Sequence, residues 1–104
     1  MVKVVWSDSA VADLESIVEC IAQDSETYAA AFAEKVLKAV EKIGTFPRIG
    51  RVVPEYNRED LRELIFHNYR IIYKVEPERV AIATIVHASR DLMRWYPPEA
   101  WDVV

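Results

Sequence analysis

The chain has 104 residues, of which 52% are hydrophobic and 29% charged, and its formal net charge at pH 7 is −4. This length fits one domain, which we assign to residues 1–104, with enough apolar side chains for a core. No apolar run approaches the roughly 20 residues that a membrane helix needs, so we expect no membrane partner. A single cysteine excludes an internal disulfide, and we expect a reducing, cytoplasmic location.

The charges are divided unevenly along the chain. Residues 1–46 contain four lysines and eight acids, whereas residues 47–104 contain eight arginines, one lysine and nine acids. The acidic balance argues against wholesale nucleic-acid binding. Because arginine suits bidentate contacts with phosphate or carboxylate, we expect any anion-binding surface in the second half. The alternative is that these arginines pair with the interleaved glutamates on a solvated face.

The first half predicts a short strand followed by two helices. The strand covers residues 2–6, and three consecutive N-cap residues then lead into a helix over residues 9–22. The second helix covers residues 26–43 and is expected to stop at Gly44. Because the joint between the helices is short, they should form an antiparallel hairpin. We interpret Cys20 as an inert packed thiol.

Each helix carries an apolar stripe that must be buried. The predicted stripes are Ala10, Leu14, Ile17, Val18 and Ile21 in the first helix, and Tyr28, Phe32, Val36, Val40 and Ile43 in the second.

The second half predicts a meander of three antiparallel strands. Residues 61–66, 69–75 and 80–87 are rich in side chains that favour strands. The first two strands are separated by His67-Asn68, and asparagine tolerates the positive φ of a tight hairpin turn. A short turn containing proline separates the second and third strands, so neighbouring strands run antiparallel.

Strict alternation along these strands separates two faces. One face, with Tyr69, Ile71, Tyr73 and Val75, is expected to pack on the helices. The opposite face comprises Arg70, Ile72 and Lys74 of the middle strand, with Ala81, Ala83, Ile85 and His87 of the last strand. Its small side chains predict a shallow concave surface that suits an extended or helical peptide.

Two shorter segments complete the prediction. Residues 51–53 form a short edge strand, and residues 91–95 form one helical turn. The aromatic tail, with Trp95, Tyr96 and Trp101, either packs back on the domain or contacts a partner. The fold class is therefore α+β: an N-terminal strand, then a helix hairpin on one face of a small, twisted, mainly antiparallel sheet, in the order β-α-α-β-β-β-β.

One polar set could carry chemistry. The sequence contains no phosphate-binding loop, dinucleotide glycine motif or Cys/His metal cluster, so we expect no cofactor and no metal. Arg70 and Arg90 are expected at the same end of the sheet, near His87 and Tyr96. Such a set could hold a scissile phosphate and help activate a ribose 2′-OH without metal. Alternatively, Arg90 pairs with an acid and ties the tail to the sheet, and His87 makes a structural hydrogen bond.

Several motifs together resemble the RelE/ParE superfamily, the toxins of type II toxin–antitoxin systems that are often called plasmid stabilisation proteins. The resemblance covers about residues 3–95. The motifs are Trp6 with Ala10 and Leu14, Phe46-Pro47-x-x-Gly50-Arg51, Pro54, Arg62-Glu63-Leu64, Tyr69-Arg70-Ile71-Ile72-Tyr73-Lys74-Val75 and His87-x-x-Arg90-Asp91.

The resemblance implies a compact toxin silenced by a cognate antitoxin of ribbon-helix-helix type, whose tail wraps across the sheet and the helix hairpin. The open sheet face predicted above would suit that tail, so Ile72, Ala81, Ala83 and Ile85 are the expected antitoxin-binding residues. An exposed sheet edge could also accept an added strand. A homo-oligomer or a toxin–antitoxin hetero-oligomer is expected.

The two branches of the superfamily differ in their targets. RelE-like toxins cut messenger RNA on the ribosome, and their pattern would make Arg70, Arg90, Tyr96 and His87 catalytic. The paired lysines of that branch are missing here, and Glu63 stands where a carboxylate would repel phosphate. The ParE-like branch is not a nuclease and acts on DNA gyrase. The intact helix hairpin and the run RELIFHNYRIIYKV look more like ParE, which we favour. The alternatives are the ribosome-dependent endonuclease and a non-toxic peptide-binding module.

Overall fold

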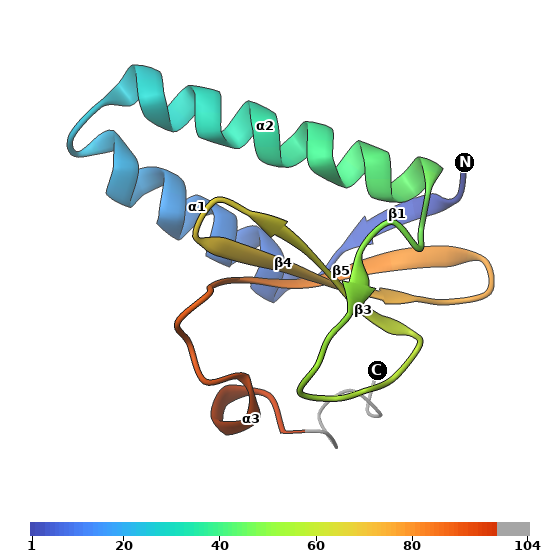
Figure 1. Ribbon diagram of the computed structural model, residues 1–104. Coiled ribbons are helices and arrows are strands. Elements are labelled where there is room, and N and C mark those ends of the chain that lie inside the picture. Colours follow the sequence, from blue (N-terminus) through green and yellow to red (C-terminus); the bar gives the residue numbers. More distant parts are fainter. Residues whose placement is uncertain (98–104) are drawn as a thin grey trace.

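In the computed structural model, which describes residues 1–97, a pair of helices lies over one face of a five-stranded sheet (Figure 1). In chain order the elements are β1 (Lys3–Trp6), α1 (Asp8–Ala22), α2 (Glu26–Thr45), β2 (Arg51–Val52), β3 (Leu61–Phe66), β4 (Tyr69–Val75), β5 (Arg79–His87) and α3 (Leu92–Trp95). The predicted α+β class and element order are confirmed.

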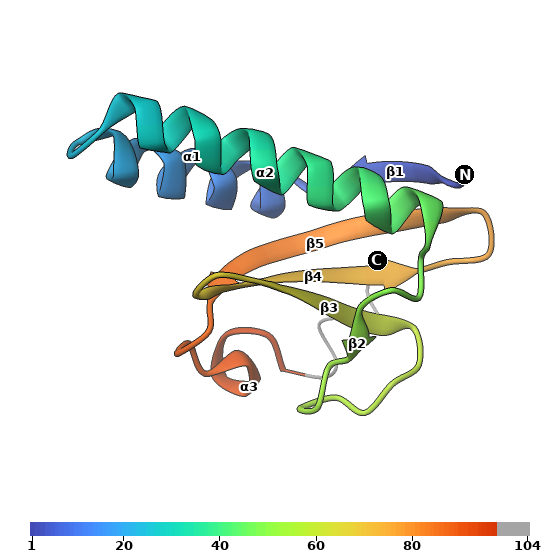
Figure 2. The same cartoon turned by 45° about the horizontal axis from the view of Figure 1, so that its top comes forward.

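The sheet has the strand order β1-β5-β4-β3-β2. The neighbours β2–β3, β3–β4 and β4–β5 are antiparallel, as short connections require, whereas β1 lies parallel to β5. A parallel neighbour needs a long crossover, and the helix hairpin supplies one between β1 and the rest of the sheet. Figure 2 shows the hairpin covering one face, with α3 and the β2–β3 connector beneath the other.

Serine side chains cap the two long helices. The hydroxyl of Ser7 accepts from the amide of Ala10 at 3.0 Å, and that of Ser25 accepts from the amide of Tyr28 at 3.1 Å. The predicted stop at Gly44 is wrong, because α2 continues through it to Thr45. Gly44 instead lies buried against the first strand, and its carbonyl accepts from the amide of Val2 at 3.1 Å. This hydrogen bond joins the last turn of α2 to the residue before β1.

The core between the helices and the sheet follows the predicted stripes, with one exception. Tyr28 is 61% exposed, and Ala29 takes the buried place on that turn of α2. The buried members of this cluster, which we call the helix-side core, are Ala10, Phe32, Val36, Val40, Ile43, Ile71, Tyr73, Val80, Ile82 and Ile85. Packing of the predicted β4 face against the helices is confirmed.

A β-bulge changes the two faces of β5. Ile72 pairs with Thr84 but Tyr73 pairs with Ile82, so Ala83 is the extra residue on β5. Strict alternation was therefore wrong beyond this point. Ile85 belongs to the helix-side core and not to the opposite face.

The second face of the sheet is covered, so the prediction of an open concave surface was wrong. A second cluster, which we call the lower core, consists of the buried residues Val53, Leu61, Ile72, Val86 and Leu92. The β2–β3 connector contributes Val53 and the α3 segment contributes Leu92, and both side chains are fully buried. These two segments fold under the sheet and fill the space that a peptide was expected to occupy (Figure 2).

Two local predictions, on the β3–β4 turn and on Cys20, are wrong. The residue with positive φ in the β3–β4 turn is His67 (φ 53°) and not Asn68. Cys20 is exposed and not packed.

The single helical turn predicted near the end of the chain is confirmed as α3, with Asp91 as its N-cap. Trp95 remains 60% exposed while Tyr96 is half-buried, and Trp101 lies outside the described residues. Within residues 1–97, no helix is long and apolar enough to cross a bilayer.

Candidate functional site

The most heavily paired charge in the fold is Arg70 on β4, whose side chain is only 8% exposed. Its Nε donates to Oε1 of Glu63 at 2.5 Å, while Nη1 and Nη2 donate to the two carboxylate oxygens of Glu55 at 2.7 and 2.8 Å. Glu63 in turn accepts from Nε of Arg51 at 2.5 Å, and its side chain is fully buried. Two arginines and two glutamates thus form one neutral group, which we call the Arg70 cluster.

The strand register explains why these side chains meet. Arg51 lies directly opposite Glu63 in the β2–β3 pair. Glu63 lies opposite Ile72 in the β3–β4 pair, so Arg70 is its diagonal neighbour on the same face. Glu55 comes from the β2–β3 connector, which brings its carboxylate to the far side of the guanidinium.

The cluster has a clear electrostatic signature. The hydrogen bonds from Arg70 hold the pKa of the Glu55 carboxyl below its usual value, against the opposing effect of burial. The same hydrogen bonds to Glu55, followed by those to Glu63, raise the pKa of Arg70. Because two carboxylates already accept from this guanidinium, its donors are not presented to an incoming phosphate.

The lowered pKa of Glu55 predicts a pH-dependent contribution to stability. A depressed carboxyl pKa stabilises the fold above the unfolded value near 4.5, and the contribution is lost as pH falls through the folded pKa. We therefore expect the difference in unfolding free energy between wild type and Glu55→Gln to be largest near pH 7. It should shrink steadily below about pH 4.5 in urea denaturation across a pH series. A difference that stays constant or grows on acidification would contradict this assignment.

The predicted nuclease residues are not brought together as a set. Arg70 points into the cluster described above. By alternation, His87 lies on the other face of the sheet, because it pairs with Tyr69, whose ring it contacts at 5.5 Å. The guanidinium of Arg90 lies over the ring of Trp95 at 4.9 Å, and no acid among residues 1–97 forms an ion pair with it. The hydroxyl of Tyr96 lies 3.3 Å from Thr84 Oγ1.

Two members of that set do share a hollow of about 280 Å³ beside α1. It is lined by His87 and Arg90 together with Asp13, Ser16, Ile17, Cys20, Tyr69, Ile85 and Val86. His87 is exposed there, and its Nδ1 lies 2.7 Å from the hydroxyl of Ser89. Arg70 is not among the lining residues, so the hollow holds one arginine and not the pair that was predicted.

The predicted antitoxin-binding residues do not form one exposed face either. Ile72 is fully buried in the lower core, whereas Ile85 is 3% exposed in the helix-side core. Ala81 and Ala83 are half-buried.

A polar link between α1 and the bulge was missed. One carboxylate oxygen of Asp13 accepts from Thr84 Oγ1 at 2.5 Å and from the amide of Ile85 at 3.1 Å. Thr84 is fully buried, so this carboxylate supplies partners for polar groups beside the bulge. Asp13 lies outside the apolar stripe of the first helix, and no local sequence pattern indicates the bulge beside which its carboxylate binds.

The motif Phe46-Pro47-x-x-Gly50-Arg51 brings the link between α2 and β2 close to the sheet. The amide of Gly50 donates to the hydroxyl of Tyr73 at 2.9 Å, and that hydroxyl donates to the carbonyl of Pro47 at 2.8 Å. Burial raises the pKa of Tyr73 above its usual value. The motif therefore anchors the link between α2 and β2, and β2 leads on to the β2–β3 connector that covers the second face.

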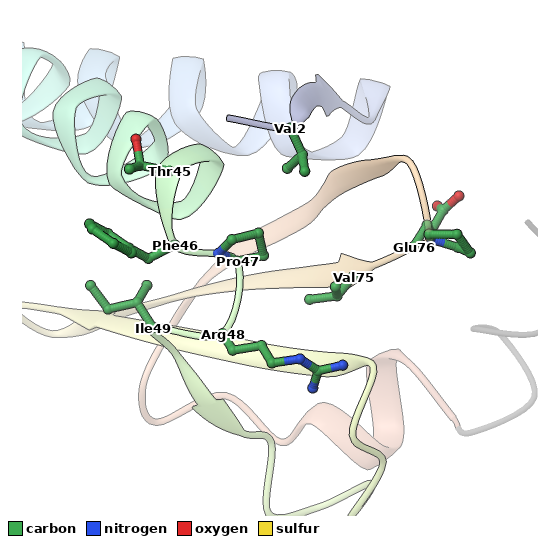
Figure 3. A pocket seen from close by; sticks show the side chains of 9 residues that line it. Val2, Thr45, Phe46, Pro47, Arg48, Ile49, Val75 and Glu76 are labelled. Carbon is green, nitrogen blue, oxygen red and sulfur yellow. The ribbon is translucent and has the colours of Figure 1, made fainter.

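An apolar hollow of about 770 Å³ lies where the chain leaves α2 toward β2 (Figure 3). Figure 3 shows Phe46 and Ile49, from the link between α2 and β2, lying along it, with Val2 and Val75 on its other side. Phe46 is 61% and Ile49 43% exposed. Exposed large apolar side chains of this kind suit contact with apolar groups of another protein. Within the described part of the chain, no group of three or more His, Cys, Asp or Glu is placed to hold a metal ion.

The family of the chain follows from comparison with known proteins. Residues 4–92, from β1 to the start of α3, match the family described as the ParE toxin of the type II toxin–antitoxin system parDE. The chain belongs to the ParE toxin family, within the RelE/ParE superfamily. This ParE-family chain is also 35% identical over 91 residues to Toxin RelE2 of Caulobacter vibrioides, a match that covers 86% of this chain and 99% of that toxin.

Solved structures carry the same fold. A chain of the chromosomal ParDE system from P. aeruginosa has a TM-score of 0.70 and 18% identity, over 84% of this chain and 96% of that one. A chain of the toxin–antitoxin complex RelBE2 from Mycobacterium tuberculosis has a TM-score of 0.58 and 20% identity, over 83% and 96% of the two chains. The predicted superfamily and fold are confirmed.

Proposed function

We propose that this ParE-family toxin acts by inhibiting DNA gyrase and is kept silent by a cognate antitoxin. The observation that carries the proposal is the Arg70 cluster. A metal-free nuclease of the superfamily would use this strand arginine on the scissile phosphate. Here Glu55 and Glu63 accept from all three of its nitrogens.

The charge of the chain supports the same choice. Affinity for RNA rests largely on neutralising phosphates, and a net charge of −4 works against it. A phosphate at Arg70 would have to lie beside the carboxylates of both Glu55 and Glu63, and their combined negative charge would repel it. A toxin that acts by binding a protein has no such requirement.

The antitoxin, the location and the assembly belong to the same proposal. The related solved chains come from the ParDE system and the RelBE2 complex, which are toxin–antitoxin assemblies by their titles. We extend this to a cognate antitoxin of ribbon-helix-helix type, a cytoplasmic location, a role in plasmid stabilisation and a toxin–antitoxin hetero-oligomer. The apolar hollow beside Phe46 and Ile49 offers a protein partner exposed apolar contacts (Figure 3).

One observation favours a second function, ribosome-dependent cleavage of messenger RNA. The 35% identical relative carries the name Toxin RelE2. The lining of the hollow beside α1 also includes an imidazole, from His87, and a guanidinium, from Arg90. Under this alternative the chemistry would use that hollow without Arg70.

A pair of assays on the purified chain separates the two functions. We expect it to block supercoiling of relaxed plasmid by gyrase in a dose-dependent way, with activity restored by the antitoxin. Messenger RNA bound to ribosomes should stay intact when the purified chain is added. The Arg90→Ala variant should give the same result in this cleavage assay. Cleavage of ribosome-bound message that Arg90→Ala abolishes, with gyrase unaffected, would overturn the proposal. Inactivity in both assays would indicate a non-toxic binding module.

A further inference from the structure

We infer that the Glu55 carboxylate occupies a position on Arg70 that could otherwise bind a phosphate. In this way Glu55 prevents this face of the sheet from binding phosphate. The inference concerns one carboxylate and one guanidinium and does not depend on which target the toxin has. The gyrase assay and the titration described below can therefore fail separately.

The geometry of the Glu55 contact is that of an anion site. Nη1 and Nη2 of Arg70 donate in parallel to the two carboxylate oxygens, at 2.7 and 2.8 Å. This two-pronged contact is the one that arginine makes equally with carboxylates and with phosphates. The guanidinium side chain is 8% exposed, so its fork is held in place by the surrounding fold before any ligand arrives.

The two glutamates on Arg70 have different roles. Glu63 lies on β3, its side chain is fully buried, and it also accepts from Arg51, so it is a fixed part of the sheet. Glu55 lies on the connector, and its side chain is 29% exposed. Solvent reaches Glu55 but not Glu63. Glu55 is therefore the carboxylate that an outside anion could replace.

The charges of the Arg70 cluster also indicate that Glu55 is the group that keeps an outside anion from binding. Arg51 and Arg70 balance Glu55 and Glu63, so the native cluster is neutral and offers no net attraction to an anion. Removal of the Glu55 carboxylate leaves one net positive charge, an empty guanidinium fork and an opening to solvent. Such a site is suited to a tetrahedral oxyanion such as phosphate.

The test is calorimetric titration of inorganic phosphate into the full chain at low salt. Glu55→Ala should bind phosphate about tenfold more tightly than wild type, since each charge-assisted hydrogen bond contributes more than the 1.4 kcal/mol that a factor of ten requires. The matched control is Glu78→Ala, which makes the same change in net charge in the β4–β5 turn at the other end of β4. It should bind no better than wild type.

A second substitution shows whether Arg70 holds the phosphate. Glu55→Ala with Arg70→Lys keeps a cation for Glu63 but removes the fork, and the gained affinity should fall back to the control level. Circular dichroism checks that each variant is folded, and Glu55→Ser carries the same expectation should the alanine variant not fold. Equal phosphate affinity in Glu55→Ala and Glu78→Ala would overturn the inference, as would a gain that survives Arg70→Lys.

Discussion

Replacing Arg70 with methionine should lower the free energy of unfolding by roughly 3–5 kcal/mol, the typical cost of removing one partner from a buried ion pair. The substitution keeps a long apolar stem but removes the guanidinium that pairs with Glu63 and Glu55. Among residues 1–97, Glu63 would then retain Arg51 as its one ion-pair partner, while its own side chain stays fully buried. Urea denaturation at pH 7, followed by circular dichroism, measures the loss.

Two further variants serve as controls for the expected loss of stability in Arg70→Met. Arg79→Met removes an arginine that is 45% exposed and pairs with Glu76, so it should cost less than about 1 kcal/mol. The double variant Arg70→Met with Glu63→Leu removes both buried charges, and much of the lost stability should return. A loss in Arg70→Met no larger than that in Arg79→Met would mean that the cluster does not stabilise the fold.

Gly50→Ala should destabilise the fold by about 3 kcal/mol or more, because the added methyl group has no room. A Cβ built at Gly50 lies 2.5 Å from the carbonyl oxygen of Glu63 and 2.6 Å from the hydroxyl of Tyr73. The first atom belongs to the backbone of β3 and cannot rotate away. Any shift of the link between α2 and β2 would also break the Gly50–Tyr73 hydrogen bond. Thermal and urea unfolding of the variant test the prediction.

The chain contains its own control for this substitution. At Gly44 a Cβ would lie 2.9 Å from Val4 Cγ2, which belongs to a side chain that can reorient. Gly44 also lies inside α2, where alanine is favoured over glycine by about 1 kcal/mol. Gly44→Ala should therefore change stability little. Similar losses at the two glycines would contradict the role given to the Gly50 approach.

Most of the fold could be predicted because its signals are local. The helix stripes, the serine caps and the β3–β4–β5 meander each depend on a few neighbouring residues, and the structure has them where the sequence placed them. The errors at Tyr28 and Cys20 concern the same region. Both residues lie near the turn of the helix hairpin, which projects beyond the sheet (Figure 2), and both side chains are exposed there.

The site was harder to predict because its contacts cross the sheet. Alternation placed Ile85 on the wrong face, since a bulge adds one residue without any mark in the sequence. The sequence did indicate a carboxylate near Arg70, because Glu63 follows Arg62 on the preceding strand. The Glu55 contact depends on the path of an irregular connector, which no periodicity describes. For the same reason the burial of the second face by Val53 and Leu92 was missed.

The central claim is that this ParE-family toxin acts on gyrase and does not cut message. Its most direct test is to induce the chain in cells without the antitoxin and to follow DNA damage and message integrity in the same culture. The account predicts a DNA-damage response while newly made messenger RNA stays intact. Arrest of translation with cleaved message and no DNA-damage response would contradict it.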